Sequence, residues 1–282
     1  MTQNSMEIEM DTEKLTYLKE KAREIRYLTM DEIGYLGVGH IGGCLSIADV
    51  LAVLYFDEMR VRPDEPNWED RDRFVLSKGH AGPALYAALA AKGYFDKSEL
   101  HTLNRPHTHL PSHCDMLLTT GVDMTAGALG QGLSCAVGMA KAGKAFHKDY
   151  NVFCSIGDGE SQEGQIWEAS SIAAQWKLDN LYVFLDYNKF QIDGGLDDIN
   201  SLIDPVKRWE SFGFETEEID GNDIEAICGA LQRMKAVRGK PKMIVLRTVK
   251  GKGVSYVEAA GAGNHNMTFT PEQTLAALKE LE

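Results

Sequence analysis

The stretch from Gly157 to Asn188 constrains the fold more than any other part of the sequence. Each of its ends follows a short apolar run, residues 152–156 before the first and 181–185 before the second. Such runs, rich in Val, Ile and aromatic residues, are typical of buried parallel strands. The segment between them, 163–176, is predicted to be a helix. The stretch is therefore expected to form a strand–helix–strand unit.

The polar residues that follow the two strands favour a metal-bound diphosphate. Asp158 lies between Gly157 and Gly159, and Asn188 follows Asp158 by thirty residues. Open α/β sheets bind ligands at the carboxyl ends of their strands. A hard cation such as Mg²⁺ prefers oxygen ligands such as carboxylates and amides, and glycine lets the backbone approach a phosphate. The alternative is a pair of ordinary turns, because Gly-Asp-Gly is also a common turn signal.

Predicted helices and strands alternate along the rest of the chain. Three capping pairs are expected to begin helices: Ser46 with Asp49, Asp96 with Glu99, and Asn222 with Glu225. The further helices are expected over 12–33, 46–58, 83–93, 127–147, 205 onward, 222–239 and 271 onward, and the further strands over 74–76, 214–219 and 243–249. This alternation predicts an α/β fold with a doubly wound, mainly parallel sheet flanked by helices. Residues 1–12 are expected to form a flexible N-terminus, and residues 13–282 a single domain.

Composition excludes several classes of partner. The chain has 282 residues, a hydrophobic share of 44% and a net charge of −13. This charge argues against nucleic acid and against anionic membrane surfaces as partners. No apolar run approaches transmembrane length, and the acidic, polar N-terminus is unlike a signal peptide. The five cysteines show no metal or redox spacing, so a cytoplasmic protein with reduced thiols is expected.

Two motifs are weak evidence for other kinds of site, a dinucleotide site and a zinc site. The run 37–42 matches G-x-G-x-x-G, but a helix and not a strand is predicted before it, which argues against a dinucleotide site. Four histidines lie between His101 and His113. They are a weak candidate for zinc, because the segment lacks the spacing of known zinc sites. Histidines in Gly- or Pro-containing loops can also bind phosphate or hydroxyl oxygens and exchange protons near neutral pH.

Taken in order, these motifs resemble transketolase, a family of thiamine-diphosphate enzymes. The resemblance covers nearly the whole chain after residue 12 and implies the thiamine-diphosphate-binding fold, specifically the domain that binds the diphosphate. The matching pieces are Gly39-His40, Ser77-Lys78-Gly79-His80, Pro111-Ser112-His113, Gly127-Ala128-Leu129-Gly130-Gln131-Gly132, Gly157-Asp158-Gly159, Gln162-Glu163-Gly164, Asn188, Ile192-Asp193-Gly194 and Lys250-Gly251-Lys252-Gly253. The match is looser around His113, which lacks the usual preceding Gly and following Pro, and around His265.

The resemblance implies a role for each matching position. It implies that Asp158, Asn188 and the carbonyl of Phe190 hold Mg²⁺ or Ca²⁺. It implies cofactor contacts at His80, Gly127, Leu129, Gly157, Gly159, Glu163, Glu168 and His265, with Glu163 and Glu168 also near a dimer interface. It places His40, His113 and His265 at the donor sugar, near the reacting carbon, as the catalytic histidines.

The resemblance also implies a partner. Complete transketolases carry a second α/β domain, which supplies the glutamate that protonates the aminopyrimidine ring, and a third, C-terminal domain. We therefore expect this chain to be the N-terminal subunit of a split transketolase that works with a separate C-terminal subunit, as α₂β₂, and that also self-associates. The implied reaction transfers a two-carbon ketol unit from a ketose, often phosphorylated, to an aldose. The alternatives are the α subunit of a 2-oxoacid dehydrogenase and a non-catalytic thiamine-diphosphate-binding protein.

Overall fold

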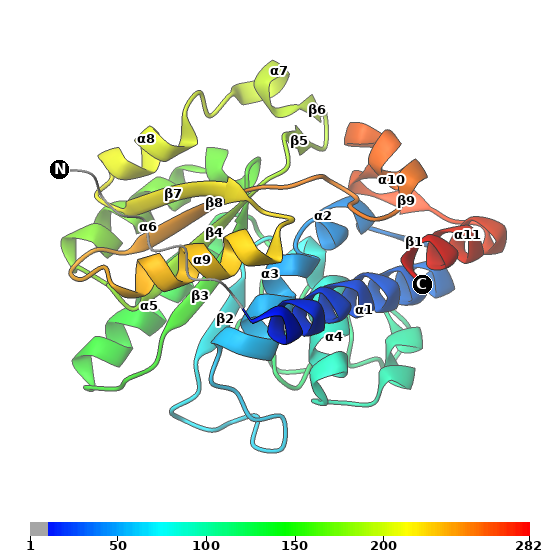
Figure 1. Ribbon diagram of the computed structural model, residues 1–282, viewed down its shortest axis with the longest axis horizontal. Helices are drawn as coiled ribbons and strands as arrows, with labels where there is room; N and C mark the ends of the chain where they lie inside the picture. Colours follow the sequence, from blue (N-terminus) through cyan, green and yellow to red (C-terminus); the bar gives the residue numbers. More distant parts are fainter. Residues whose placement is uncertain (1–10) are drawn as a thin grey trace.

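A computed structural model describes residues 11–282 of the chain. Its centre is a five-stranded sheet in the order β2-β3-β4-β8-β7 (Figure 1). Every neighbouring pair of these strands is parallel. The strands are β2 (Arg73–Leu76), β3 (Val152–Gly157), β4 (Leu181–Tyr187), β7 (Glu215–Asp220) and β8 (Lys242–Arg247). The predicted strand–helix–strand unit and the parallel sheet are therefore confirmed.

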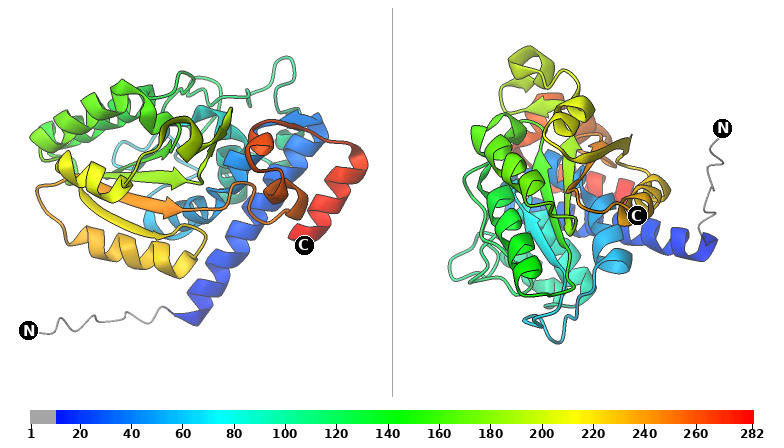
Figure 2. Two further views of the ribbon diagram at one scale, coloured as in Figure 1. Left: turned by 90° about the horizontal axis from the view of Figure 1, so that it is seen from above. Right: turned by 90° about the vertical axis from the view of Figure 1, so that its left-hand side faces the viewer.

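Helices cover both faces of the sheet (Figures 1 and 2). One layer holds α1 (Thr12–Leu36), α3 (Ala48–Val53), α4 (Gly82–Lys92) and α9 (Ile224–Lys235), and the other holds α5 (Gln131–Ala145), α6 (Gly164–Gln175) and α8 (Pro205–Ser211). Successive residues of β3 point to opposite layers: Phe153 packs in the hydrophobic core under α1, α3, α4 and α9, and Cys154 packs in the core under α5, α6 and α8. Because both faces of the sheet are buried, β3 and β4 are mainly apolar, with Ser155 and Asp186 as exceptions, and their sequences show no regular polar alternation.

The chain beyond β8 folds back over α1. It forms α10 (Ser255–Ala259), the 3₁₀ turn η5 (Gly261–His265), β9 (Met267–Thr268) and α11 (Pro271–Leu281). β9 pairs antiparallel with β1 (Val38–Gly39), and β5 (Phe190–Gln191) pairs antiparallel with β6 (Gly194–Gly195). Neither short sheet is predicted by the sequence, since two-residue strands leave no periodic signal. The return of the chain brings residues near 265 beside residues near 40.

Two predicted helix caps are wrong. Ser46 does not begin a helix, because α3 follows Ile47 without a side-chain cap, and the Ser46 hydroxyl instead donates to Asp186. α9 is capped by Asp223 and not by Asn222, and it ends at Lys235 and not at Gly239. In both cases the predicted cap residue itself has a tertiary partner that the local pattern cannot reveal: Ser46 donates to Asp186, and Asn222 donates to Asp49.

Other boundaries differ by a few residues. α1 runs through Gly34 and ends only where Gly37 adopts the left-handed conformation, with φ of 89°. The helix expected over 127–147 begins at Gln131, since the residues before it form the glycine-rich turn. Asp96 begins only a 3₁₀ helix. The remaining elements are α2 (Ile41–Leu45), α7 (Leu196–Asn200), the π-helical turn η1 (Leu54–Glu58) and the 3₁₀ turns η2 (Gly79–Ala81), η3 (Lys97–Thr102) and η4 (Glu160–Gln162).

The prediction of a flexible segment over 1–12 falls mainly on residues 1–10, which lie outside the described residues. Asp11 accepts a hydrogen bond from the Glu13 amide and caps α1. Among the helices of residues 11–282, none is both long and apolar enough to cross a bilayer.

Candidate active site

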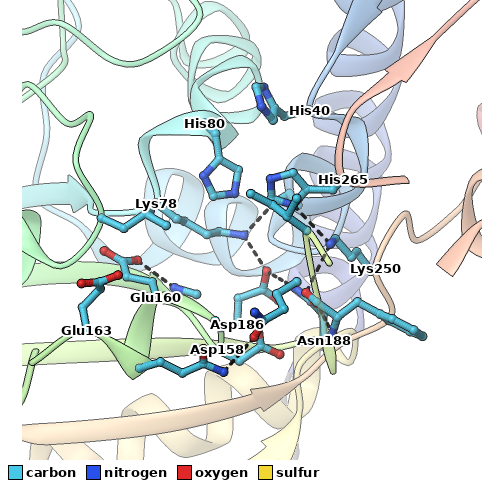
Figure 3. A pocket seen from close by; sticks show the side chains of 18 of the residues that line it. His40, Lys78, His80, Asp158, Glu160, Glu163, Asp186, Asn188, Lys250 and His265 are labelled. Carbon is cyan, nitrogen blue, oxygen red and sulfur yellow. Dashed lines mark hydrogen bonds and ion pairs between the residues drawn. The ribbon is translucent and has the colours of Figure 1, made fainter. Parts of the chain in front are cut away.

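A pocket of about 360 Å³ lies at the carboxyl edge of the sheet, at the ends of β3 and β4 (Figure 3). Its wall comes from segments that are far apart in sequence. Nearly all of the predicted site residues line it: His40, His80, His113, Gly127, Leu129, Gly157, Asp158, Gly159, Glu163, Asn188, Phe190 and His265. The structure therefore brings together at one place residues that belong to separate motifs along the chain.

Asp158 and Asn188 end neighbouring strands on the floor of the pocket. The Asp158 carboxylate is buried and accepts hydrogen bonds from the amides of Gly159 (2.8 Å) and Lys189 (2.7 Å). Burial, reinforced by the charge of Asp186, raises the pKa of Asp158 to about 7. Asn188 Oδ1 accepts the amide of Phe190 at 3.1 Å. Asp158 is thus a buried carboxylate whose hydrogen-bond partners are backbone amides and not a cationic side chain.

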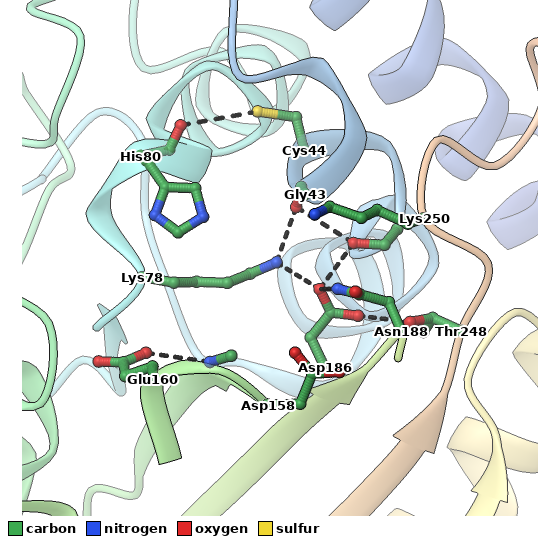
Figure 4. Close-up of polar contacts among 12 residues, drawn as sticks. Gly43, Cys44, Lys78, His80, Asp158, Glu160, Asp186, Asn188, Thr248 and Lys250 are labelled. Carbon is green, nitrogen blue, oxygen red and sulfur yellow. Dashed lines mark hydrogen bonds and ion pairs between the residues drawn. The ribbon is translucent and has the colours of Figure 1, made fainter. Parts of the chain in front are cut away.

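Asp186 lies beside these two residues and has a different environment (Figure 4). Lys78 Nζ is 2.5 Å from Asp186 Oδ2, and the same oxygen accepts hydrogen bonds from Ser46 (2.7 Å) and from Asn188 Nδ2 (2.9 Å). Although burial opposes it, the charge and hydrogen bond of Lys78 hold the pKa of Asp186 below its usual value. The lysine therefore neutralises Asp186 and leaves Asp158 without a paired countercharge among residues 11–282.

The sequence did not identify Lys78, Asp186 or Glu160 as site residues. Glu160 is buried and accepts hydrogen bonds from the amides of Gly130 (2.9 Å) and Gly157 (3.0 Å) and from Ser77. It ties the glycine-rich turn to the ends of β2 and β3. A charged residue within one or two positions of a glycine motif or strand end is the signal that would have found all three.

Lys250 enters the pocket from the loop after β8. Its ammonium group lies 3.2 Å from the Phe190 carbonyl and 3.4 Å from His265 Nδ1. Burial lowers the pKa of Lys250 to about 8, against the opposing charges of Asp158 and Asp186. This side chain is the pocket's second lysine, and unlike Lys78 it has no carboxylate of the described residues within ion-pair distance.

Four imidazole rings gather at the other wall of the pocket. The centroid of the His40 ring lies 5.5 Å from that of His80, 5.8 Å from that of His113 and 5.5 Å from that of His265. Burial lowers the pKa of every one of the four, and for His265 burial and the Lys250 charge lower it to about 4. All four rings are therefore neutral at pH 7 and can each donate and accept a hydrogen bond.

Some predicted or suspected residues lie elsewhere. Glu168 is exposed on α6 and does not line the pocket, in contrast to Glu163. Of the four histidines between positions 101 and 113, His113 alone lines the pocket; His101 bonds to Asp31 at 2.7 Å, and the other two are exposed.

The donor set fits a divalent cation and a diphosphate. The carboxylate of Asp158, the amide oxygen of Asn188 and the carbonyl of Phe190 are oxygen ligands of the kind that Mg²⁺ or Ca²⁺ takes. Each oxygen has a second lone pair free beside the hydrogen bond it accepts. Lys250 and the glycine backbone offer positive charge and close approach to an anion. The pocket thus combines an uncompensated buried carboxylate with donors for phosphate.

Comparison with known proteins decides the family. A family model described as transketolase, thiamine diphosphate binding domain, matches residues 18–280. The chain belongs to this transketolase family. It is 55% identical over 265 residues to the 6-deoxy-6-sulfo-D-fructose transketolase subunit SqwG of Clostridium sp. (strain MSTE9). The aligned residues make up 94% of this chain and 96% of that relative. It is 41% identical to an apulose-4-phosphate transketolase subunit of Phocaeicola vulgatus, over 96% of this chain and 95% of the relative.

A solved transketolase has the same fold. The structure of transketolase from Leishmania mexicana superimposes with a TM-score of 0.87 and 31% identity, over 92% of this chain and 40% of that chain. The expected transketolase function is therefore confirmed, in preference to the 2-oxoacid dehydrogenase and non-catalytic alternatives. The chain is an enzyme subunit that carries the thiamine-diphosphate-binding domain of a transketolase.

Proposed function

We propose that this chain is the diphosphate-binding half of a two-subunit transketolase, in which a separate C-terminal subunit completes the site. The names of the two relatives, both called transketolase subunits, support a partner, because each relative is about as long as this chain. The same names give a sulfo-sugar and a sugar phosphate as substrates, and we propose a ketose of this anionic class for the present enzyme. Free thiols at all five cysteines support a cytoplasmic location.

We further propose that Asp158, Asn188 and the Phe190 carbonyl would hold Mg²⁺ or Ca²⁺, which would supply positive charge for the cofactor diphosphate. The single observation that carries this is the buried Asp158 carboxylate, which has no cationic partner in the described chain, next to an Asp186 that has one. Removing such a carboxylate from water costs several kcal/mol unless a cation compensates it. Thiamine diphosphate, when bound, supplies the electron sink for cleavage of the ketose carbon–carbon bond.

The chain's own residues orient the sugar and move protons. His40, His113 and His265 are neutral, and their rings line one cavity, so they can accept protons from donor hydroxyls and return them. His80 and Lys250 lie between these rings and the strand ends, where they would contact the diphosphate side of the cofactor. Gly127 and Leu129 also line the pocket, where they would contact the aminopyrimidine side of the cofactor.

We propose an α₂β₂ assembly in which the chain also contacts a second copy of itself. Apolar side chains are exposed beside the pocket, along α6 and just after it: Leu129 (37% exposed), Ile172 (36%) and Trp176 (42%). Glu163 directly precedes α6, and Glu168 lies on α6 one helical turn before Ile172. Exposed apolar groups of this kind mark partner surfaces.

The metal assignment is tested by titrating thiamine diphosphate with Mg²⁺ into the purified chain and its Asp158→Ala variant, with calorimetric detection. Asp64→Ala is the matched control, because Asp64 is an exposed loop carboxylate. Metal-dependent cofactor binding should vanish in the first variant and persist in the control. Equal affinity in all three proteins would overturn the metal assignment.

A further inference from the structure

Three pocket residues come from segments that are far apart in the sequence. His40 precedes α2, Lys250 lies in the loop after β8, and His265 ends η5. The geometry of the donor site depends on how these three segments are held together, because the rings of His40 and His265 are 5.5 Å apart and Lys250 reaches His265. Their mutual placement therefore requires a connection between the three segments.

Asn264 lies at the point where the segments meet. It is fully buried, and its Nδ2 donates to the carbonyl of Lys250 and to the carbonyl of Val257, both at 2.9 Å. An asparagine amide has two N–H donors, so both are used. One side chain therefore joins the loop after β8 and α10 to η5.

The third segment, which contains Gly42, packs closely against the same Asn264 side chain. The amide of Gly251 donates to the carbonyl of Gly42 at 3.0 Å. A Cβ on Gly42 would overlap Asn264 Oδ1, and a Cβ on Gly251 would lie 2.6 Å from Val257 Cγ1 and 3.0 Å from Asn264 Nδ2. Gly251 also has φ of +87°, which glycine adopts readily. Two glycines thus make room for one asparagine, and the three residues together form a junction, here called the Gly42–Gly251–Asn264 junction.

Each member of the junction is close in sequence to one pocket residue. His40 precedes Gly42 by two residues, Lys250 precedes Gly251 directly, and His265 follows Asn264 directly. We infer that Asn264 is a positioning residue that sets the mutual placement of His40, Lys250 and His265, and so the affinity of the site for the donor ketose. This inference rests on the proposed function for its substrate, and on the contacts above for its geometry.

The chain offers a matched control for the loss of a buried asparagine. Asn180 is also buried, and its Nδ2 donates to two backbone carbonyls, those of Ala140 (3.1 Å) and Tyr150 (3.4 Å). It precedes β4, at the end of the sheet opposite the pocket. Replacing either residue by leucine keeps similar volume and removes two hydrogen bonds, but only Asn264→Leu releases pocket segments.

The first measurement is kinetic, on the enzyme assembled with its C-terminal subunit in the presence of saturating thiamine diphosphate and Mg²⁺. Asn264→Leu should raise the KM for the donor ketose about tenfold or more, because displacements on the order of an ångström in a positioned site cost this much. Asn180→Leu should lower thermal stability to a similar extent and leave the donor KM unchanged. An unchanged donor KM in Asn264→Leu, with activity lost only in proportion to unfolded protein, would overturn the inference.

The second measurement does not depend on activity. Hydrogen exchange of the chain, followed by mass spectrometry, should accelerate in Asn264→Leu at residues 39–45, 249–253 and 261–266, and in Asn180→Leu at none of these. Faster exchange spread over the whole chain in Asn264→Leu would contradict a local junction. If Asn264→Leu does not fold, Gly42→Ala, which displaces Oδ1 from the other side, carries the same expectations. Absence of ketol transfer in the wild-type enzyme would refute the proposed function, whereas the exchange pattern alone decides the junction.

Discussion

Lys78 and Asp186 form a buried ion pair in the wall of the pocket, with 2.5 Å between Nζ and Oδ2. Lys78 also donates to the carbonyl of Gly43 at 2.7 Å. Asp186 also accepts a hydrogen bond from Asn188 Nδ2, which holds the orientation of the Asn188 amide. The pair therefore supports the candidate metal ligands without being among them.

Lys78→Met should destabilise the chain by roughly 3–5 kcal/mol, because it leaves Asp186 buried and unpaired. Lys144→Met is the control, since Lys144 is an exposed partner of Asp179 and such pairs contribute at most about 1 kcal/mol. Urea unfolding of the two variants measures the difference. Losses of equal size would show that the buried pair has no special role.

His113→Ala should lower turnover by about 10²-fold or more while cofactor affinity changes little, because general acid–base groups contribute on that scale. His109→Ala provides the control within the same segment, as His109 lies outside the pocket. Collapse of cofactor binding in His113→Ala, with normal turnover by the residual enzyme, would place His113 in the structure and not at the sugar.

The pH profile of kcat/KM for the donor should stay level on the acid side to below the ordinary histidine pKa of about 6.5. The reason is that burial lowers the pKa of His40 and His113, and burial with the Lys250 charge lowers that of His265 to about 4. The rings therefore stay neutral until the pH falls below these lowered values. An acid limb centred at 6.5 or above would contradict a neutral histidine cluster.

Glu32→Gln should stabilise the chain at pH 8.5 more than at pH 6. Glu32 is fully buried on α1, and within the described part of the chain neither of its carboxylate oxygens has a hydrogen-bond partner. Burial, with a smaller effect of Asp31, raises its pKa well above the usual value. A group whose pKa is raised on folding is most favourable below its unfolded pKa and loses stability as pH rises through the folded pKa. The variant cannot ionise and so escapes this loss.

Thermal melts at the two pH values measure that difference for Glu32→Gln. Glu20→Gln is the control, because Glu20 is exposed on the same helix, and its effect should be small at both values. A gain for Glu32→Gln that is the same at pH 6 and pH 8.5 would show that ionisation of Glu32 does not limit stability.

The sequence predicted the sheet and its parallel strands, because apolar runs are local signals, and the resemblance to transketolase supplied most of the residues that line the pocket. It missed the roles of Lys78 and Asp186, whose meaning depends on a contact across 108 positions. It also assigned Ser46 and Asn222 to helix caps, whereas their partners are Asp186 and Asp49. Asn264 could not be found from sequence at all, since its partners follow from the return of the chain over α1.

The central claim is that this chain provides one half of a transketolase site and needs a partner for the other. Its most direct test is a ketol-transfer assay with thiamine diphosphate and Mg²⁺, in which the purified chain, the C-terminal transketolase subunit of the same organism and their mixture are measured side by side. Activity should be present in the mixture and absent from either polypeptide by itself. Full ketol transfer by the purified chain, without a second polypeptide, would contradict the account.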